Sequence, residues 1–368
     1  MLEGLEVINW HELEHAYGMA DDVPELLRSL ASADAPSRQD ALSKLYSNIY
    51  HQGTVFEATV YAIPFLLELS QTEAVQDRDK ILIYLAHLAR SHSYLEENQN
   101  LLFYNDELDK PEFQVQIQHE MIWIRRVNRA VRSGINVYLS LLKHNDSKLR
   151  IAAPYILAYC QRQASEFIPY LKHCLAQERS SQVRASLILS LGFLESPQLA
   201  NRELFMQFLS SEESGLVRLA AAMTLVRLAK DKTPLEAIAI PIEIIEHPIS
   251  VKEAYARLPW ANSDVISDAC ACLCYLGATG NVVIPALINA LKTVDGYSAL
   301  SVVRTLLYLA FNGHELADTI EYKNTSVQKS VIEAIASYDR VWQFNSNMAH
   351  LLRSFGLPQE RNQLQAFL

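Results

Sequence analysis

The feature that most constrains this chain is a motif that recurs every 34 residues between residues 146 and 230. Arg150, Arg184 and Arg218 each stand four residues after an Asp or Ser, and small residues follow each arginine. The spacing is constant, since 184 − 150 = 34 and 218 − 184 = 34. A fixed internal period of about 20–50 residues is typical of repeat proteins, in which each unit buries its apolar face against its neighbours. The period therefore predicts an array of repeats.

Each copy of the motif has the pattern of an α-helix. The Asp or Ser before the arginine is a preferred N-cap, and apolar residues follow at helical spacing, as with Leu219, Met223 and Val226. Partner helices are indicated where proline falls in the first helical turn, since its missing N–H costs nothing there. Segments of this form occur at 23–27, 63–67, 168–171, 240–244 and 284–288. We therefore predict an all-α fold made of stacked helix pairs.

This pattern resembles HEAT repeats, of the short kind found in bacterial HEAT-like proteins. The cap, valine, arginine and alanine run of that family matches residues 146–153, 180–186 and 214–221, and residues 34–41 are a fourth match. A weaker copy at 264–271 has Asp268 in place of the arginine. The resemblance implies a right-handed α-α superhelix, an α-solenoid. It implies no activity, because HEAT arrays serve many unrelated functions.

We expect a single HEAT-like array over residues 1–368 with three departures from the repeat. Residues 1–20 are predicted to form an N-terminal capping helix. Residues 340–368 are predicted to be a C-terminal capping segment, which shields the last apolar face as terminal repeats must. The polar residues 96–112 are interpreted as an insertion between repeats, and insertions in solenoids often form the binding face.

The totals favour a protein partner over nucleic acid or membrane. The net charge is −10, with 32 Lys and Arg against 42 Asp and Glu, whereas nucleic-acid binding usually needs a basic balance. We expect no apolar run of the roughly 20 residues that cross a membrane, and residues 1–10 do not resemble a signal peptide. We therefore expect a cytoplasmic, bacterial protein without a cofactor, and the five cysteines are expected to be free, buried apolar side chains. The oligomeric state stays open.

One string matches a catalytic motif. Residues His11, Glu12 and His15 have the form H-E-x-x-H, in which two histidines one helical turn apart bind zinc and the glutamate activates water. Only ten residues precede the string, and neither a strand-like segment nor a third ligand accompanies it. We prefer a capping helix with these side chains turned outward, and we assign no metal site and no catalytic residue. A zinc hydrolase is kept as a lesser alternative.

The first group of candidate binding residues is His51, Gln52 and Glu57. We expect His51 and Gln52 at a helix end, with Gly53 ending that helix at a positive φ and Thr54 capping the next. Side chains at such helix ends often face a shared groove. The competing interpretation is that His51 caps a helix C-terminus and interacts with its dipole.

The second group lies on a helix predicted at 113–132, and the third is a single tryptophan. The second group is Trp123 with Arg125, Arg126 and Arg129. It could hold an acidic segment, a phosphate or a carboxylate, or it could pair with the acidic residues of the insertion. Trp260 lies in an irregular loop predicted at 249–263. It could contact a partner or pack over the seam between repeats.

We therefore predict a non-catalytic scaffold or adaptor that binds a protein partner on its concave face. An immunity-type or regulatory protein is one version. The alternative is an enzyme on a HEAT-like frame, similar to phycobilin lyases or to alkylpurine DNA glycosylases. The acidic balance fits a glycosylase poorly, because glycosylases use a basic face to hold DNA.

Overall fold

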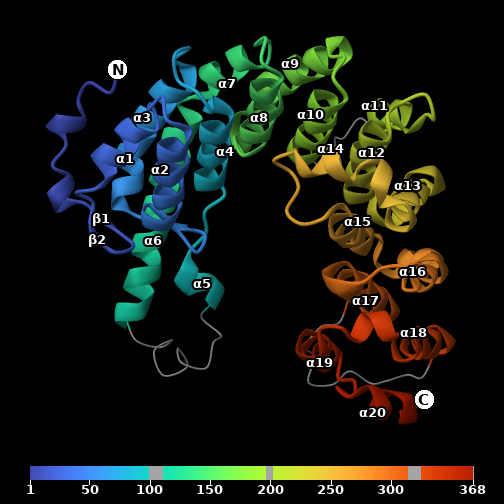
Figure 1. The fold of residues 1–368 in the computed structure, drawn as a ribbon. Helices are drawn as coiled ribbons and strands as arrows, with labels where there is room; N and C mark the ends of the chain where they lie inside the picture. Colours follow the sequence, from blue (N-terminus) through green and yellow to red (C-terminus); the bar gives the residue numbers. More distant parts are fainter. Residues whose placement is uncertain (99–110, 196–201, 314–324, 368) are drawn as a thin grey trace. The chain divides into compact units, whose positions relative to one another are not determined.

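The computed structural model describes residues 1–98, 111–195, 202–313 and 325–367. The chain divides into two compact units, Met1–Gln177 and Glu178–Leu368, which are called unit 1 and unit 2 below. Each unit is mainly helical (Figure 1). The fold class is therefore all-α, as the repeat pattern predicted. That both units belong to one continuous array over residues 1–368 stays a prediction.

Unit 1 consists of helix pairs. Its helices are α1 (Val23–Ser29), α2 (Ala35–Asn48), α3 (Glu57–Gln71), α4 (Arg78–Ala89), α5 (Tyr94–Asn98), α6 (Pro111–Arg132), α7 (Ile135–Leu141), α8 (Ser147–Ala158) and α9 (Ala164–Gln177). Helix α1 packs on α2, α3 on α4, and α7 on α8, and α4 also packs against α8 (Figure 1). Residues 99–110, most of the predicted insertion at 96–112, lie outside the described residues.

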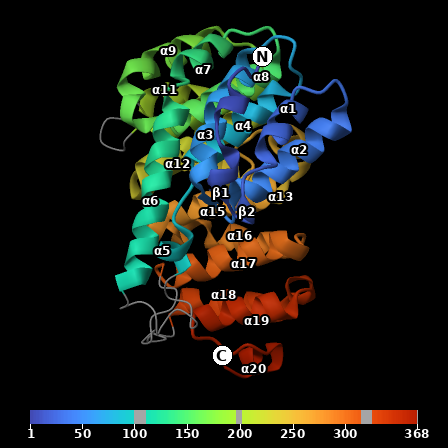
Figure 2. The same ribbon diagram turned by 90° about the vertical axis from the view of Figure 1, so that its left-hand side faces the viewer.

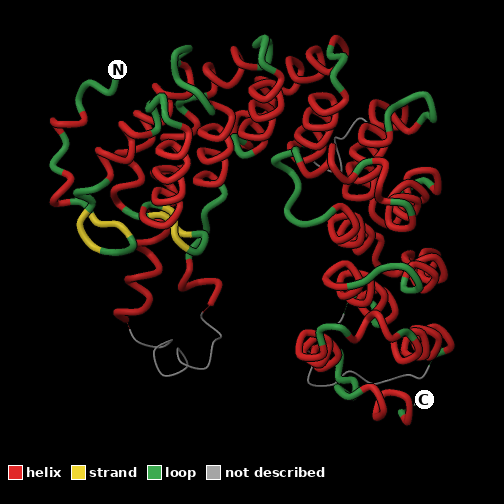
Figure 3. The backbone as a smooth tube through the Cα atoms, in the orientation of Figure 1, coloured by secondary structure: helices red, strands yellow, loops and turns green. Residues whose placement is uncertain are grey.

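Residues 1–20 do not form the predicted capping helix. They contain two short 3-10 helices, η1 (Leu5–Val7) and η2 (Trp10–Glu12), followed by a hairpin of β1 (Glu14–His15) and β2 (Gly18–Met19) (Figure 3). Gly4 and Gly18 have φ values of 98° and 120°, which an α-helix cannot contain. Trp10 is buried and donates its indole N–H to the carbonyl of Leu5 at 2.9 Å. Burial of Trp10 thus fixes a folded-back segment rather than a helix.

Unit 2 continues the succession of helices. They are α10 (Ser181–Leu194), α11 (Arg202–Met206), α12 (Gly215–Ala229), α13 (Leu235–Glu246), α14 (Lys252–Ala256), α15 (Val265–Leu273), α16 (Ile284–Ala290), α17 (Gly296–Ala310), α18 (Ser326–Ser337), α19 (Asn345–Ser354) and α20 (Arg361–Ala366). Neighbours pack in chain order, with α10 on α12, α12 on α13, α13 on α15 and α15 on α17. Figure 2 shows α16 to α20 following one another in the same way. At the end of the chain, α20 packs on α18 and buries Leu364.

The repeat arginines bond to groups outside their own helices. Asp34, Asp146 and Ser214 cap their helices by accepting from a backbone N–H of the first turn, whereas Ser180 makes no such side-chain bond. Each arginine then reaches out of its own helix, and Arg150 donates to the carbonyl oxygens of His144 and Asn145. Three arginines bond to a carboxylate near the next helix: Arg38 to Asp77 at 2.8 Å, Arg184 to Glu213 at 2.6 Å and Arg218 to Glu243 at 3.3 Å. We call these bonds the arginine ladder.

One apolar stretch corrects an expectation. Residues 265–290 are, by length and composition, sufficient to cross a membrane. They do not form one helix, because Gly277 has φ 55° and ψ −134° and interrupts the 3-10 segment η8 (Cys274–Val283) between α15 and α16. Leu273, Leu276 and Ile284 are buried in one apolar cluster with residues of α17 and α18. In this structure the stretch is part of the core of unit 2.

Candidate functional site

His51 lies in a hairpin and not at a helix end. It belongs to β3 (Tyr50–His51), which pairs with β4 (Thr54–Val55). Gln52 and Gly53 form the turn, with φ values of 49° and 86°. Two positive φ values are typical of the type I′ turn that joins two strands. The positive φ of Gly53 was predicted correctly, but it closes a hairpin and does not end a helix.

The cap predicted for the next helix is wrong as well. Thr54 is buried in β4, and its hydroxyl has no partner among the described residues. The N-cap of α3 is Phe56, whose backbone N–H donates to the hydroxyl of Thr59 at 3.0 Å. Glu57 is the first residue of α3 and is half-buried. Thr59 therefore holds the helix start that the sequence assigned to Thr54.

The two hairpins of unit 1 meet through side chains. The ring of Tyr17, from the first hairpin, lies edge-on to that of His51 with centroids 5.4 Å apart. Its hydroxyl is 3.4 Å from Nδ1 of His51. In the first hairpin the backbone N–H of Tyr17 donates to Nδ1 of His15, so Nε2 of His15 carries the proton and donates to Asp22 at 3.0 Å. The structure thus places His51 beside an exposed tyrosine that sequence reasoning did not connect with it.

The same arrangement removes the geometry of the H-E-x-x-H motif. His11 is in a 3-10 turn and lies 3.0 Å from Asp21, whereas His15 is in β1 and is bonded to Asp22. The two histidines are not one turn apart on an α-helix, as the zinc motif requires. Within the described parts of the chain, no group of three or more His, Cys, Asp or Glu side chains is placed to hold a metal ion.

The arginines predicted on α6 are exposed. Arg125, Arg126 and Arg129 face solvent, and the guanidinium of Arg126 lies 4.8 Å from the ring centroid of the half-buried Trp123. Among the residues that the structure describes, we find no carboxylate within ion-pair distance of these three side chains. We call Trp123, Arg125, Arg126 and Arg129 the arginine face. Helix α6 also packs on β4, so the arginine face and the His51 hairpin belong to neighbouring elements.

Sequence reasoning missed an aromatic cluster on α2, α4 and α8, with one further member in β3 and one directly after α8. The hydroxyl of Tyr46 lies 2.8 Å from Nδ1 of His87, and the ring of His87 meets that of Tyr155 with centroids 6.0 Å apart. Tyr50 and Tyr159 extend the cluster, at 6.0 Å from Tyr46 and 5.4 Å from Tyr155. We call these five residues the aromatic row. All except the buried Tyr155 are half-buried and keep part of the side chain in solvent.

Burial sets the protonation of the aromatic row. Desolvation, with a smaller contribution from the nearby Arg90 charge, lowers the pKa of His87 to about 4. Desolvation also raises the pKa of Tyr46 and of Tyr155 well above the usual value. His87, Tyr46 and Tyr155 are therefore uncharged at neutral pH, and the hydroxyls and the imidazole can form hydrogen bonds with a neutral surface.

Trp260 packs onto α10 of unit 2. Its indole N–H donates to the hydroxyl of Ser186 at 3.2 Å, and its ring lies 5.8 Å from that of Phe193. The loop that carries it contains the short helix α14, which the sequence did not predict. Trp260 remains half-buried, so it packs over neighbouring helices and still keeps part of its ring accessible.

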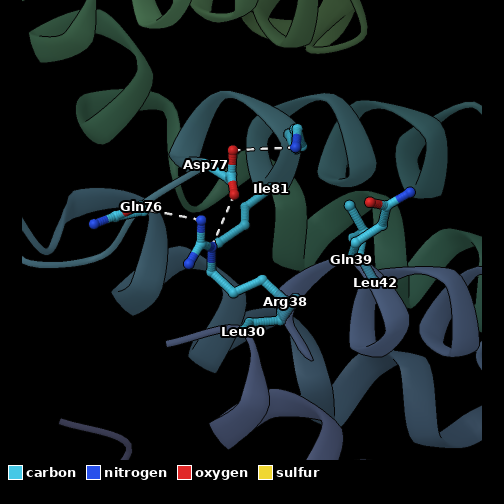
Figure 4. Close-up of a pocket in the computed structure, with 8 residues that line it drawn as sticks. Leu30, Arg38, Gln39, Leu42, Gln76, Asp77 and Ile81 are labelled. Atoms are coloured by element: carbon cyan, nitrogen blue, oxygen red, sulfur yellow. Dashed lines mark hydrogen bonds and ion pairs between the residues drawn. The ribbon is translucent and has the colours of Figure 1, made fainter. Parts of the chain in front are cut away.

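A pocket in unit 1 is formed by the arginine ladder. Its lining includes Leu30, Arg38, Gln76, Asp77 and Lys80 (Figure 4). Arg38 donates to Asp77 at 2.8 Å and to Gln76 at 3.3 Å, and Lys80 pairs with Asp77 at 3.1 Å. These polar groups are bonded to one another and hold the helices together, so we do not assign a ligand to this pocket.

Comparison with known proteins yields only distant likenesses. No family model and no curated protein matches the chain. Among solved structures, Kap121p bound to Pho4p aligns with 91% of this chain at 14% identity and a TM-score of 0.40. An engineered protein aligns with 91% of this chain and 92% of its own length at 17% identity and a TM-score of 0.31. The chain spans 33% of the length of the Kap121p chain. These values carry no argument about function, and the fold class of helical repeats rests on the helices described above.

Proposed function

We propose that the protein is a non-catalytic scaffold that binds a protein partner, with the aromatic row as a main contact surface. The aromatic row is the observation that carries this proposal. Its rings come from α2, β3, α4 and α8 and from the residue that follows α8, and successive rings lie within 6.0 Å of one another. Tyrosine and arginine are enriched at protein interfaces, and rings already packed on one another lose little freedom on binding.

The rigidity of the row supports the same proposal. Tyr46 packs at 4.4 Å on the fully buried Tyr84, whose hydroxyl donates to the carbonyl of Leu45 at 2.8 Å. The exposed part of the row is therefore held from below by the core. Pre-organised side chains bind with a smaller entropic cost than mobile ones.

The arginine face suggests the chemistry of a second contact. Three exposed guanidiniums beside a tryptophan can bind a carboxylate-rich segment through paired hydrogen bonds. We therefore propose that the partner presents an acidic segment to α6. Arginine charges of this exposed kind act mainly on the rate of association, and that rate falls as salt is added.

The test is affinity purification from native cells with quantitative mass spectrometry. The variant Tyr50→Ala/Tyr159→Ala removes two ends of the aromatic row. The matched control is Tyr61→Ala, since Tyr61 is 38% exposed on α3 and lies outside the row. We expect one protein to be recovered with wild type and with Tyr61→Ala, and to fall at least tenfold with the row variant. Recovery of the chain alone, or equal recovery by all three folded proteins, would refute the proposal.

A further inference from the structure

Arg227, in α12 of unit 2, has an unusual environment. Its side chain is half-buried, and its Nη2 is buried without a hydrogen-bond partner in the described parts of the chain. The guanidinium lies 5.7 Å from the ring centroid of Phe193. Phe193 in turn packs against Trp260, which is fixed by its bond to Ser186. Arg227 thus lies beside Phe193, which packs on Trp260, and we call the surroundings of these three side chains the recess.

Among the residues that the structure describes, no carboxylate forms an ion pair with Arg227. Burial lowers its pKa, and the opposing contributions come from Tyr275 and Cys272, not from a carboxylate. Cys272 is itself buried, which raises its pKa far above neutrality, so it carries no charge at pH 7. Removing a charge from water without a partner is costly. An anionic group placed beside Arg227 would therefore stabilise its charge.

Other arginines of the chain differ from Arg227 in their partners or in their exposure. Arg184 and Arg218 have similar burial, but each is paired with a glutamate. The three arginines of the arginine face have no carboxylate partner among the described residues, but their side chains are exposed. Arg227 alone among these has neither a carboxylate nor full hydration, although the chain has more acidic than basic residues. The chain is rich in acidic residues, but none of the described ones pairs with Arg227.

The repeat period connects the recess to the aromatic row. Tyr159, Phe193 and Arg227 occupy one repeat position, since 193 − 159 = 34 and 227 − 193 = 34. The same position therefore supplies one end of the aromatic row in unit 1 and two members of the recess in unit 2. If Tyr159 contacts a partner, the equivalent residues Phe193 and Arg227 are candidates for contacts of the same kind.

We propose that Arg227, Phe193 and Trp260 receive one carboxylate from an acidic side chain of the bound protein segment. A single guanidinium matches one carboxylate in charge and offers it a planar fork. A phosphate dianion would exceed the single positive charge of Arg227. The aromatic rings suit the methylene groups that precede a carboxylate. This inference rests on the proposed function, because it names a chemical feature of the same partner.

The test selects peptides from a random heptapeptide library displayed on phage, using the immobilised full chain. We expect wild type to enrich peptides with Asp or Glu at one fixed position. A synthetic copy of the selected peptide should bind Arg227→Met at least tenfold more weakly, which corresponds to about 1.4 kcal/mol. Replacing the acidic residue by its amide should weaken binding to wild type by a similar factor and should not weaken binding to Arg227→Met further.

Three results would overturn the inference: selected peptides without a fixed acidic residue, no enriched peptide, or equal affinity for wild type and Arg227→Met. Tighter binding when phosphoserine replaces the acidic residue would also overturn it, in favour of a phosphate site. Arg227→Met should melt no lower than wild type, because it removes an unpaired charge. If it does not fold, Arg227→Lys, which keeps the charge and loses the planar fork, takes its place in the same comparison.

The two proposals fail in different ways. Loss of the captured cellular protein in the row variant but not in Arg227→Met keeps the scaffold function and refutes the carboxylate recess. Absence of any captured protein with wild type refutes the scaffold function, whereas the peptide selection reports on the recess by itself.

Discussion

Gly192→Ala should destabilise unit 2, although alanine is the better helix former. Gly192 lies in α10, where it faces α12. A Cβ at this position would lie 2.5 Å from Cγ2 and 2.7 Å from Oγ1 of Thr224. Both distances are shorter than real carbon contacts, so one of the two helices or the threonine must move. Thr224 is only 3% exposed and has little room to do so.

The magnitude follows from three opposing effects. Replacing glycine by alanine inside a helix gains about 1 kcal/mol from propensity. Overpacking a close helix contact costs about 1–3 kcal/mol. Turning Thr224 away also breaks its 3.4 Å hydrogen bond to the carbonyl of Ile188, and leaving a buried hydroxyl unpaired costs about 1–3 kcal/mol. Because the two costs outweigh the gain, we expect a net loss of roughly 1–5 kcal/mol.

The assay is urea unfolding followed by the fluorescence of the two tryptophans of unit 2, Trp260 and Trp342. Trp260 packs beside Phe193, which is on the same helix as Gly192. Trp10 and Trp123, in unit 1, are replaced by phenylalanine so that the signal reports on unit 2. Thr224→Ala provides the second edge of a double-mutant cycle. The double variant should be more stable than the sum of the single changes by about 1 kcal/mol. Stabilisation by Gly192→Ala alone, or strict additivity, would refute the close-contact reasoning.

The remaining predictions concern both units and use thermal or chemical unfolding of the full chain. Burial lowers the pKa of His87 to about 4, so the unfolded chain binds a proton at this residue before the folded chain does as pH falls. The free energy of unfolding should therefore decrease as pH drops from about 6.5 to 4, by at most about 3 kcal/mol. His87→Gln should remove this dependence. Gly53→Ala should lower the free energy of unfolding by about 1–2 kcal/mol because of its positive φ, and by more because the new Cβ would clash with His92. Gly18→Ala should cost less, because Gly18 also has a positive φ but no atom lies close to its Cβ position. Equal losses would contradict the clash. Cys272 should resist alkylation at pH 8 in the native protein and react after unfolding, since burial raises its pKa; rapid native labelling would show that α15 is not packed as described.

The repeat motif was enough to predict an all-α fold of stacked helices, because each copy combines a cap, apolar residues at helical spacing and an arginine. It also indicated the arginine ladder, since the spacing places equivalent residues on neighbouring helices. It could not locate the carboxylate partners: Arg184 finds Glu213, and nothing local in the sequence marks Arg227 as the one left without such a partner.

The errors at the N-terminus have a different origin. A glycine with positive φ serves a helix end or a hairpin turn equally well, so Gly53 alone could not decide between them. The contact of Tyr17 with His51 joins residues 34 positions apart in the chain, outside any repeat motif. The aromatic row draws on three helices, and of its members Tyr159 alone shares a repeat position with Phe193 and Arg227.

The arginine ladder has a consequence for how such a chain can change length. The rungs that end on a carboxylate span different lengths of chain: 39 positions for Arg38 and Asp77, 29 for Arg184 and Glu213, and 25 for Arg218 and Glu243. The donors Arg150, Arg184 and Arg218 keep the period of 34 residues, whereas each acceptor belongs to its own copy. Inserting or deleting one whole copy of 34 residues would therefore keep the donors in step but would give a guanidinium a new neighbour without its carboxylate. The number of copies can change at low cost only where a new acidic residue arises with the new copy.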